Sequence, residues 1–293
     1  MKKTVTNYGR SVRARLLNVS KQEGERFQQV VTRYLQERLL YRLSMSRYQC
    51  NFVLKGGALL YAYQGMAARP TLDIDFMGDR IDNAKEHIVK VFREILSIDC
   101  PTDGVSFLTD TLQASDIAIE REYPGIRISV EVTLDTIRQT LSSDIGFGDV
   151  IVPHPVVLDY PVQLKDMEEP RILAYSQETV VAEKFQTVIA RSVYNSRMKD
   201  FFDLYRFAVS HEGLDEEVLR EAVIATFRNR RTSYTENHVF FSEAFGHNQD
   251  LNTRWNSYLR KLRYPEQLPF DEVANVIATW LKPYWEKVGD VKE

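Results

Sequence analysis

The feature that most constrains the fold is a pair of aspartates in the segment LDIDFM, which otherwise has the apolar pattern of a buried β-strand. Side chains alternate between the two faces of a strand, so Asp73 and Asp75 share one face and Leu72, Ile74 and Phe76 the other. Two such carboxylates lie about 6–7 Å apart, and on a half-buried sheet they would repel each other and be costly to desolvate. A divalent cation removes both costs, because Mg²⁺ favours one or two carboxylates completed by phosphate and water.

Two glycines before this strand bear on whether its carboxylates bind a metal or are simply solvated. Gly56 and Gly57 follow a short apolar strand predicted at 52–54 and precede a short helix predicted at 58–66. Backbone without side chains at a helix N-terminus can approach a phosphate closely and donate N–H groups to it. The glycines alone would equally suit a tight turn, and a lone D-x-D motif would suit an exposed strand face. Together they favour a site for metal and phosphate.

A third carboxylate is expected on a neighbouring strand. In the predicted strand IRISVEVTL at 126–134, Ser129, Glu131 and Thr133 share a face opposite to the apolar residues. Glu131 is therefore the candidate third acid, and Asp135 and Asp144 remain alternatives.

The remaining segments predict an α+β lobe followed by a helical lobe, with domains at 1–165 and 166–293. In the first lobe, Ser20 and Glu23 have capping-box spacing, which predicts that a helix begins near Ser20. Further expectations are a helix at 82–98, a hairpin of strands at 117–123 and 126–134, loop and strand at 142–152, and a connector at 154–161. Helical periodicity marks four later segments: 176–193, 198–209, 215–229 and 270–288.

Composition excludes several classes of protein. Of 293 residues, 44% are hydrophobic and 27% charged, which is typical of a globular chain. No apolar run approaches the roughly 20 residues that span a bilayer, and no secretory signal is recognisable, so no membrane association is expected. Only two cysteines occur, which fits a reducing cytoplasm. The net charge of −3 excludes a uniformly cationic nucleic-acid-binding surface but not a local basic groove.

Four segments carry a resemblance to a known family: LKGG, TLDIDF, VVAEKFQTVIAR and MKDFFDLY, which span 54–205. The glycine turn followed by a D-x-D strand resembles the nucleotidyltransferases of the DNA polymerase β-like superfamily. All four segments in order resemble the AbiEii family, toxins of bacterial type IV toxin–antitoxin and phage-defence systems that include the mycobacterial MenT proteins. Two features depart from the broad superfamily: the gap between the glycines and Asp73 is longer, and Gly57 stands where many members have serine.

The resemblance implies a bilobed fold, in which a polymerase β-like sheet with flanking helices is joined to a helical lobe that completes the active site. Asp73, Asp75 and Glu131 would bind Mg²⁺, with Mn²⁺ as an alternative. Lys184 would be the catalytic lysine, and Asp200 would orient it or the nucleotide. On the residues alone, the default interpretation of Lys184 is a surface lysine paired with Glu183 or another acid. Asp200 suits a cap of its helix as well as it suits a catalytic role. The residues expected to contact the nucleoside triphosphate are Lys55, Gly56, Gly57, Arg69 and Lys184.

Two positions near the acids have further interpretations. In this family a serine or threonine at the position of Thr71 can be phosphorylated to silence the toxin, so Thr71 is a candidate regulatory site. Arg69 suits either a triphosphate contact or a cover for the sheet edge.

The function implied is a Mg²⁺-dependent nucleotidyltransferase toxin that transfers NMP from an NTP to RNA, at the 3′ acceptor end of tRNA, and so blocks translation. A cognate antitoxin protein is the expected partner. Two alternatives stay open: a catalytically silent module that binds nucleotide, RNA or an antitoxin, and an enzyme that modifies a protein or a small molecule. Clustered basic residues favour a polyanionic acceptor over a small cationic one. They are Arg191, Arg197, Lys199, Arg228, Arg230 and Arg231.

Overall fold

The computed structural model describes residues 7–117, 125–210 and 213–290, and the chain divides into two compact units. The first unit contains Met1–Gly148 and Pro155–Tyr175, and the second contains Asp149–His154 and Ser176–Glu293. The domain boundary predicted between residues 165 and 166 precedes the strand β7 (Arg171–Ala174), which belongs to the sheet of the first unit.

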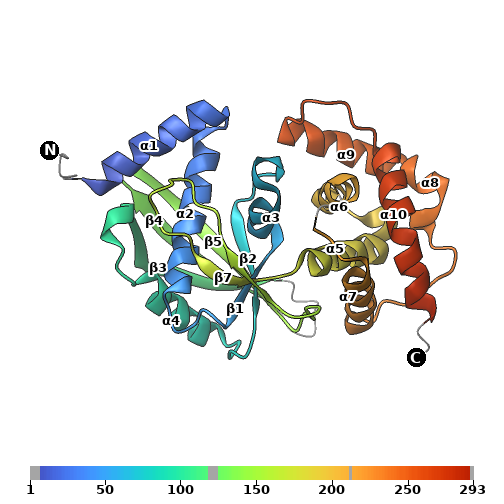
Figure 1. The fold of residues 1–293 in the computed structure, drawn as a ribbon, viewed down its shortest axis with the longest axis horizontal. Helices are drawn as coiled ribbons and strands as arrows, with labels where there is room; N and C mark the ends of the chain where they lie inside the picture. The colour runs from blue at the N-terminus through green and yellow to red at the C-terminus, as the bar shows by residue number, and fades with distance from the viewer. Residues whose placement is uncertain (1–6, 118–124, 211–212, 291–293) are drawn as a thin grey trace. The chain divides into compact units, whose positions relative to one another are not determined.

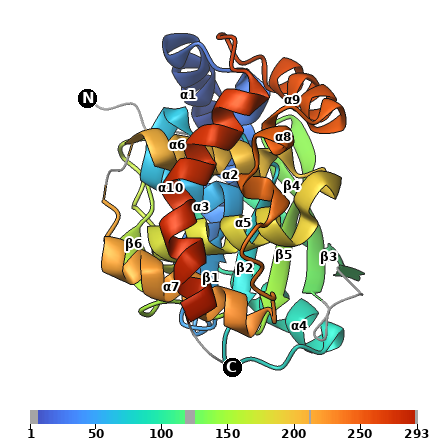
Figure 2. The ribbon, with the colours of Figure 1, turned by 90° about the vertical axis from the view of Figure 1, so that its right-hand side faces the viewer.

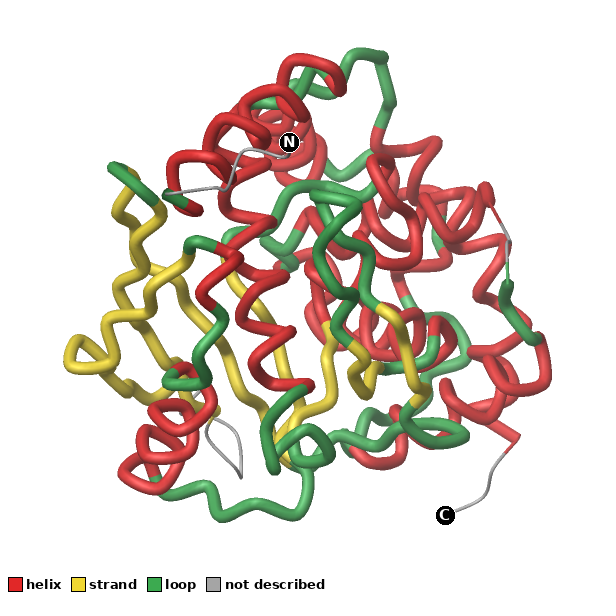
Figure 3. The backbone as a smooth tube through the Cα atoms, turned by 60° about the vertical axis from the view of Figure 1, so that its left-hand side comes forward, coloured by secondary structure: helices red, strands yellow, loops and turns green. Residues whose placement is uncertain are grey.

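In the described part of the first unit, seven strands form one mixed sheet in the order β3-β4-β5-β2-β1-β7-β6 (Figure 3, yellow). The central strand β2 pairs in parallel with β5 and antiparallel with β1, while β7 pairs in parallel with β1. The strands other than β7 are β1 (Phe52–Lys55), β2 (Asp73–Gly78), β3 (Val105–Ile117), β4 (Gly125–Leu134), β5 (Ile137–Phe147) and β6 (Val156–Asp159).

Helices cover the apolar face of this sheet. Phe52 on β1 packs edge-on against Phe76 on β2 and against Phe92 on α4, with ring centroids 5.8 and 5.4 Å apart. The helix α2 contacts α4, β5 and β7 on the same side (Figure 1). Because side chains alternate, the other face of β2, β5 and β4 is left to polar residues. The helices of this unit are α1 (Tyr8–Glu23), α2 (Phe27–Ser44), α3 (Gly56–Gln64) and α4 (Lys85–Leu96).

The helix predicted to begin near Ser20 is the main error in the first unit. Ser20 lies near the end of α1, and its hydroxyl donates to the carbonyl of Glu25 at 2.7 Å. The chain turns at Gly24, whose φ is +68°, and α2 begins at Phe27. The basic segment before Ser20 is helical because Asn7 caps it and it buries an apolar stripe of Val12 and Leu16. By contrast, the predictions of β1, α3, β2 and α4 are confirmed.

Other corrections concern strand limits. The strand β3 ends at Ile117, where a strand was predicted to begin, and the predicted residues 118–123 lie outside those described. The segment predicted as a connector contains β6, which pairs with β7. Leu72, predicted to face the core, precedes β2 and is 77% exposed.

The second unit is helical and has an aromatic core. Phe185, Phe227 and Trp285 meet with ring centroids 5.2–6.5 Å apart, and the Trp285 indole donates to the Thr235 carbonyl. The long α10 contacts α6, α7 and α8 (Figure 2). The four predicted helices are confirmed, and α8 and α9 are additional. The helices are α5 (Gln177–Arg191), α6 (Met198–Ser210), α7 (Glu216–Asn229), α8 (Glu243–Gly246), α9 (Gln249–Leu262) and α10 (Phe270–Asp290).

A mixed sheet with flanking helices, followed by a helical unit, confirms the predicted α+β class. Over the ranges that the structure describes, no helix combines the length and apolarity required to cross a membrane.

Candidate active site

The polar face of the sheet brings together charged side chains from three adjacent strands. In the parallel pairing of β2 with β5, Asp75 lies beside Asp144 and Asp73 beside Ser142. In the antiparallel pairing of β5 with β4, Asp144 lies opposite Arg127. Residues paired across a ladder share a face, so three carboxylates and one guanidinium occupy one patch of this sheet.

The glycine pair of LKGG is shaped by this patch. A β-carbon on Gly56 would lie 1.9 Å from Oδ2 of Asp75, and the φ of Gly56 is +68°, a conformation that side chains disfavour. A β-carbon on Gly57 would lie 2.7 Å from Oγ1 of Thr71. The two glycines therefore let the N-terminus of α3 pack directly on the residues that share the Asp73 and Asp75 face.

Arg127 organises the electrostatics of the patch. Its guanidinium donates two hydrogen bonds of 2.6 Å to Asp144 and lies 3.7 Å from Oδ2 of Asp73. The hydrogen bond with Asp144 raises the pKa of Arg127, and the charges of the nearby aspartates raise it further. This arginine offsets part of the repulsion between carboxylates that share a face.

Glu131 lies on the same face of the sheet as Asp73 and Asp75 but is not adjacent to them in the strand pairing. It pairs with Thr140 across the ladder and forms an ion pair with Arg138, whereas Asp144 is the direct neighbour of Asp75. Its role as the third acid stays a prediction. Of the alternatives, Asp144 lies closest in register to Asp75, and Asp135 pairs with Arg13 at 3.2 Å.

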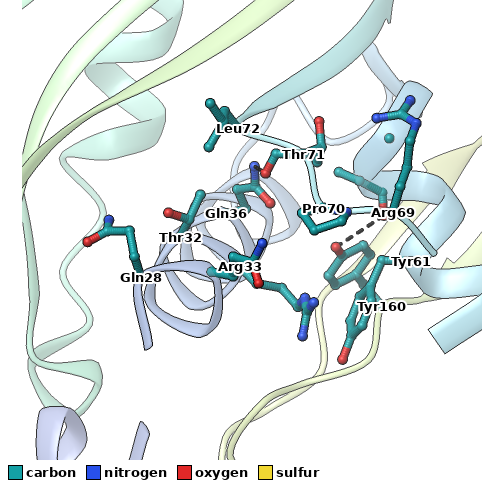
Figure 4. Close-up of a pocket in the computed structure, with 13 residues that line it drawn as sticks. Gln28, Thr32, Arg33, Gln36, Tyr61, Arg69, Pro70, Thr71, Leu72 and Tyr160 are labelled. Atoms are coloured by element: carbon teal, nitrogen blue, oxygen red, sulfur yellow. Dashed lines mark hydrogen bonds between the residues drawn. The ribbon is translucent and has the colours of Figure 1, made fainter. Parts of the chain in front are cut away.

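Thr71 and Arg69 lie in the segment that leads into β2. The Thr71 hydroxyl is 3.2 Å from Oδ1 of Asp73 and can donate to it. Both residues also line a pocket of about 100 Å³ between this segment, α2 and α3. Glutamine and tyrosine side chains form much of the wall of the pocket (Figure 4). Lys55, predicted to bind phosphate, pairs with Asp75 across the β1–β2 ladder, and its ammonium lies over the Tyr175 ring.

The predicted catalytic lysine lies in a buried ionic cluster of the second unit. The Lys184 ammonium, on α5, donates to Asp200 at 3.1 Å and to Asp203 at 2.6 Å, both on α6. Arg197 also donates to Asp200 at 2.6 Å. Burial disfavours the charged form of Asp200, but the charges of Lys184 and Arg197 outweigh that effect and lower its pKa. The two site residues predicted in this unit, Lys184 and Asp200, are thus in direct contact.

Reasoning from the sequence missed Asp203, whose distance to Lys184 is the shorter. Asp203 follows Asp200 by three residues, so both point to the same side of α6, a signal that helical spacing carries. It also missed Arg127, which alternation in IRISVEVTL places on the face of Glu131.

Among the predicted basic residues, Arg230 is part of the packing of the second unit. Its guanidinium donates to Glu183 at 2.5 Å, to Asp149 at 3.1 Å and to Gln186 at 2.9 Å, and only 16% of the side chain is exposed. It therefore ties α5 to the end of α7. Arg228 and Arg231 on either side are exposed.

The acids fit a metal ion that is shared with a substrate. Within 7–117, 125–210 and 213–290, no three His, Cys, Asp or Glu side chains form a group that could hold a metal ion. Two carboxylates on one face are nevertheless what Mg²⁺ takes from a protein when phosphates and water complete its six oxygen ligands. The patch of Asp73 and Asp75 beside the start of α3 meets that requirement.

Comparisons with known proteins identify the family of the chain. A family model described as nucleotidyl transferase AbiEii toxin, type IV TA system, matches residues 38–276. The structure is similar to MenT4, the nucleotidyltransferase toxin Rv2826c from Mycobacterium tuberculosis, with a TM-score of 0.56 and 17% identity over 96% of this chain and 99% of that one. It is also similar to JHP933 from Helicobacter pylori, with a TM-score of 0.54 and 15% identity over 90% and 94%. No curated protein sequence matches. At such identities the solved structures show the fold alone, whereas the family model spans most of the chain.

Proposed function

Because the chain belongs to the AbiEii family of nucleotidyltransferase toxins, we propose that it transfers NMP from a nucleoside triphosphate to RNA in the cytoplasm. The proposed acceptor is the 3′ end of tRNA, whose modification would block aminoacylation and translation. Mg²⁺ is the proposed metal, with Mn²⁺ as a substitute.

One observation carries the assignment of the site: Asp73 and Asp75 share a face directly beside the backbone of Gly56, where α3 begins. A helix N-terminus carries unpaired N–H groups and a partial positive charge, both of which favour phosphate. The carboxylates of Asp73 and Asp75 can therefore bind a cation beside the N–H groups at the start of α3, which can bind the triphosphate that the cation accompanies.

In the proposed reaction, the 3′ hydroxyl oxygen of the acceptor forms a bond to the α-phosphorus of the NTP. The bond from that phosphorus to pyrophosphate breaks, and the hydroxyl proton passes to a carboxylate of the polar face. A bound metal would stabilise charge on the attacking and leaving oxygens. Asp73 and Asp75 would hold it, and Gly56 and Gly57 would leave room for the triphosphate.

Lys184 is the proposed cationic partner of the triphosphate, with Asp200 as the residue that orients it. The cluster supports this role because ion pairs with two carboxylates fix the position of the Lys184 ammonium. Charge that is already oriented costs no reorganisation during the reaction. Lys55 and Arg69, from the first unit, are the other proposed triphosphate contacts.

An antitoxin is the proposed regulator, because the family is defined by a type IV toxin–antitoxin system. Phosphorylation of Thr71 is a proposed means of silencing. Its hydroxyl lies 3.2 Å from Oδ1 of Asp73, so a phosphate there would place negative charge beside the proposed metal ligand.

The test is a transfer assay with total tRNA, Mg²⁺ and each labelled NTP in turn. Asp75→Asn keeps the shape that packs against Gly56 but removes the charge, and we expect at least a hundredfold loss of labelled RNA. Asp159→Asn, an exposed acid on the edge strand β6 of the same sheet, is the matched control and should keep full activity.

The outcomes discriminate between the functions. Label on RNA with wild type and control, but not with Asp75→Asn, supports the proposal and identifies the nucleotide. Label on protein or a small molecule would overturn the RNA acceptor while keeping the enzyme class. No label anywhere, from a protein with native circular dichroism, would favour a silent binding module.

A further inference from the structure

The segment between α5 and α6 presents an aromatic side chain to solvent. It forms a short 3₁₀ turn, η3 (Ser192–Tyr194), between the helix that carries Lys184 and the helix that carries Asp200. The Tyr194 side chain is 85% exposed, the largest value for a large hydrophobic residue in the described ranges. Trp255 and Trp285, by contrast, are both buried in the core of this unit. Tyr194 therefore contributes little to the packing of the unit.

The backbone that carries Tyr194 is fixed rather than loose. Ser192 has φ +48° and ψ −134°, a conformation that residues other than glycine rarely adopt and that surrounding structure must hold in place. Arg254 of α9 provides that support, because its guanidinium donates to the carbonyls of Val193 at 3.3 Å and Asn195 at 3.2 Å. Asn195 is fully buried, and its Oδ1 accepts the backbone N–H of Arg197 at 2.8 Å. The turn η3 is strained and held in place by Arg254, yet the Tyr194 ring that it carries packs against little of the protein. Such an arrangement is typical of a binding residue.

Two arginines lie three residues before and three residues after Tyr194 in the sequence. Arg191 ends α5 just before the turn and is exposed. Arg197 follows the turn, and 44% of its side chain stays exposed although it donates to Asp200. A segment with an exposed aromatic ring between two exposed arginines matches a polynucleotide, whose bases stack and whose phosphates are negative. Tyrosine and arginine are also enriched in protein–protein interfaces, so binding of a protein instead is one of the outcomes of the test below.

We propose that Tyr194, with Arg191 and Arg197, forms the binding site for an unpaired base and its adjacent phosphates at the single-stranded 3′ end of the RNA acceptor. This inference rests on the proposed function, because it assigns the acceptor part of the same reaction. Arg197 links the two sites: it donates to Asp200, which in turn accepts from Lys184. A phosphate bound at Arg197 is therefore held next to the proposed catalytic cluster.

The test measures RNA binding without nucleotide. Fluorescence anisotropy is recorded for a single-stranded RNA labelled at its 5′ end, so that the 3′ end stays free. Base stacking on an aromatic side chain contributes about 1–3 kcal/mol, so Tyr194→Ala should raise Kd by a factor of about 5 to 150. Tyr194→Phe keeps the ring and should bind like wild type. Tyr8→Ala, a 41% exposed tyrosine on α1, is the matched control and should also bind like wild type.

A second arm separates stacking from charge. A blunt RNA duplex of equal length offers no unpaired base, so its affinity should not depend on Tyr194. Arg191→Gln should weaken binding of all single strands alike and reduce the slope of log affinity against log salt by about one counterion.

Three results would overturn the inference. In the first, Tyr194→Ala binds single strands as tightly as wild type. In the second, it weakens duplex and single strand equally, which would point to a change of shape rather than lost stacking. In the third, wild type binds no single-stranded RNA, which would leave a protein as the partner of this surface. Failure of the proposed function is distinguishable, because it would abolish transfer while leaving the effect of Tyr194 on binding intact.

Discussion

At the scale of single residues, the contact between Gly56 and Asp75 explains why this turn contains glycine. Gly56→Ala would place a methyl group 1.9 Å from Oδ2 of Asp75. We expect the free energy of unfolding to fall by about 1–3 kcal/mol. We also expect most of the transfer activity to be lost, because the Asp75 carboxylate must move out of its position beside Gly56.

Gly24 provides a matched control for this substitution. It has the same φ of +68°, but nothing lies within 4 Å of the position where its β-carbon would be. Gly24→Ala should therefore show the backbone strain alone and keep full activity. The measurement is urea unfolding together with the transfer rate of both variants. Equal effects on activity would show that the close approach to Asp75 does not matter.

Some features of the site could be predicted from the sequence, and others depend on tertiary structure. Alternation in LDIDFM placed Asp73 and Asp75 on one face, and this is confirmed by the strand pairing. The neighbours of these acids depend on strand register, which one sequence does not display. Asp144 lies beside Asp75 and Glu131 does not, because β5 pairs between β2 and β4. The contact between Lys184 and Asp203 likewise required the packing of α5 against α6.

At the scale of elements, α2 is a helix that buries ionic groups on several sides. Arg42 pairs with Asp103 at 2.7 Å, and both side chains are only 3% exposed. Glu37 is fully buried. Its Oε2 accepts the backbone N–H of Gln163, and its Oε1 lies 2.5 Å from Arg38 without hydrogen-bond geometry. The start of α2 was predicted too early because Ser20 and Glu23 have capping-box spacing although they lie at the end of α1, whereas the one-sided apolar pattern of α4 located that helix closely.

The buried Glu37 predicts an unusual pH dependence of stability. Burial raises its pKa to about 7, even though Arg38 and the Gln163 N–H favour the charged form. A carboxyl whose pKa is raised on folding stabilises the protein while it is protonated, and this contribution is lost as pH rises from its unfolded value towards 7. Its part of the unfolding free energy should fall by roughly 1 kcal/mol per pH unit between about pH 5 and 7.

Urea unfolding across this pH range would check the prediction. Glu37→Gln keeps the size of the side chain and removes the titration, so its stability should lack that slope. If both proteins lose stability equally between pH 5 and 7, then Glu37 is not the group responsible.

At the scale of the whole molecule, the chain has the same fold as MenT4 and JHP933 although it is only 17% and 15% identical to them. The fold could be predicted from the sequence because four short segments carry the family pattern. The rest of the chain needs only to be apolar at the positions that form the core. Membership of a toxin family predicts that induced expression of the wild-type chain in bacteria arrests growth.

Growth curves would measure that effect with three matched proteins. Asp75→Asn should permit growth and Asp159→Asn should arrest it as wild type does, at equal protein levels on an immunoblot. Arrest by Asp75→Asn would mean that toxicity does not require the proposed metal site, and the silent binding module would then be the better explanation.

The central position of β2 has a consequence for how the chain is made. During synthesis on the ribosome, β2 emerges before its parallel neighbour β5, which ends at Phe147 and supplies Asp144. Parallel pairing requires a long crossover connection, so the acid face cannot assemble until that later strand has been translated. A prematurely terminated chain lacks this alignment. The order of synthesis thus delays assembly of the acid face until about half of the chain has been made, which suits a member of a toxin family.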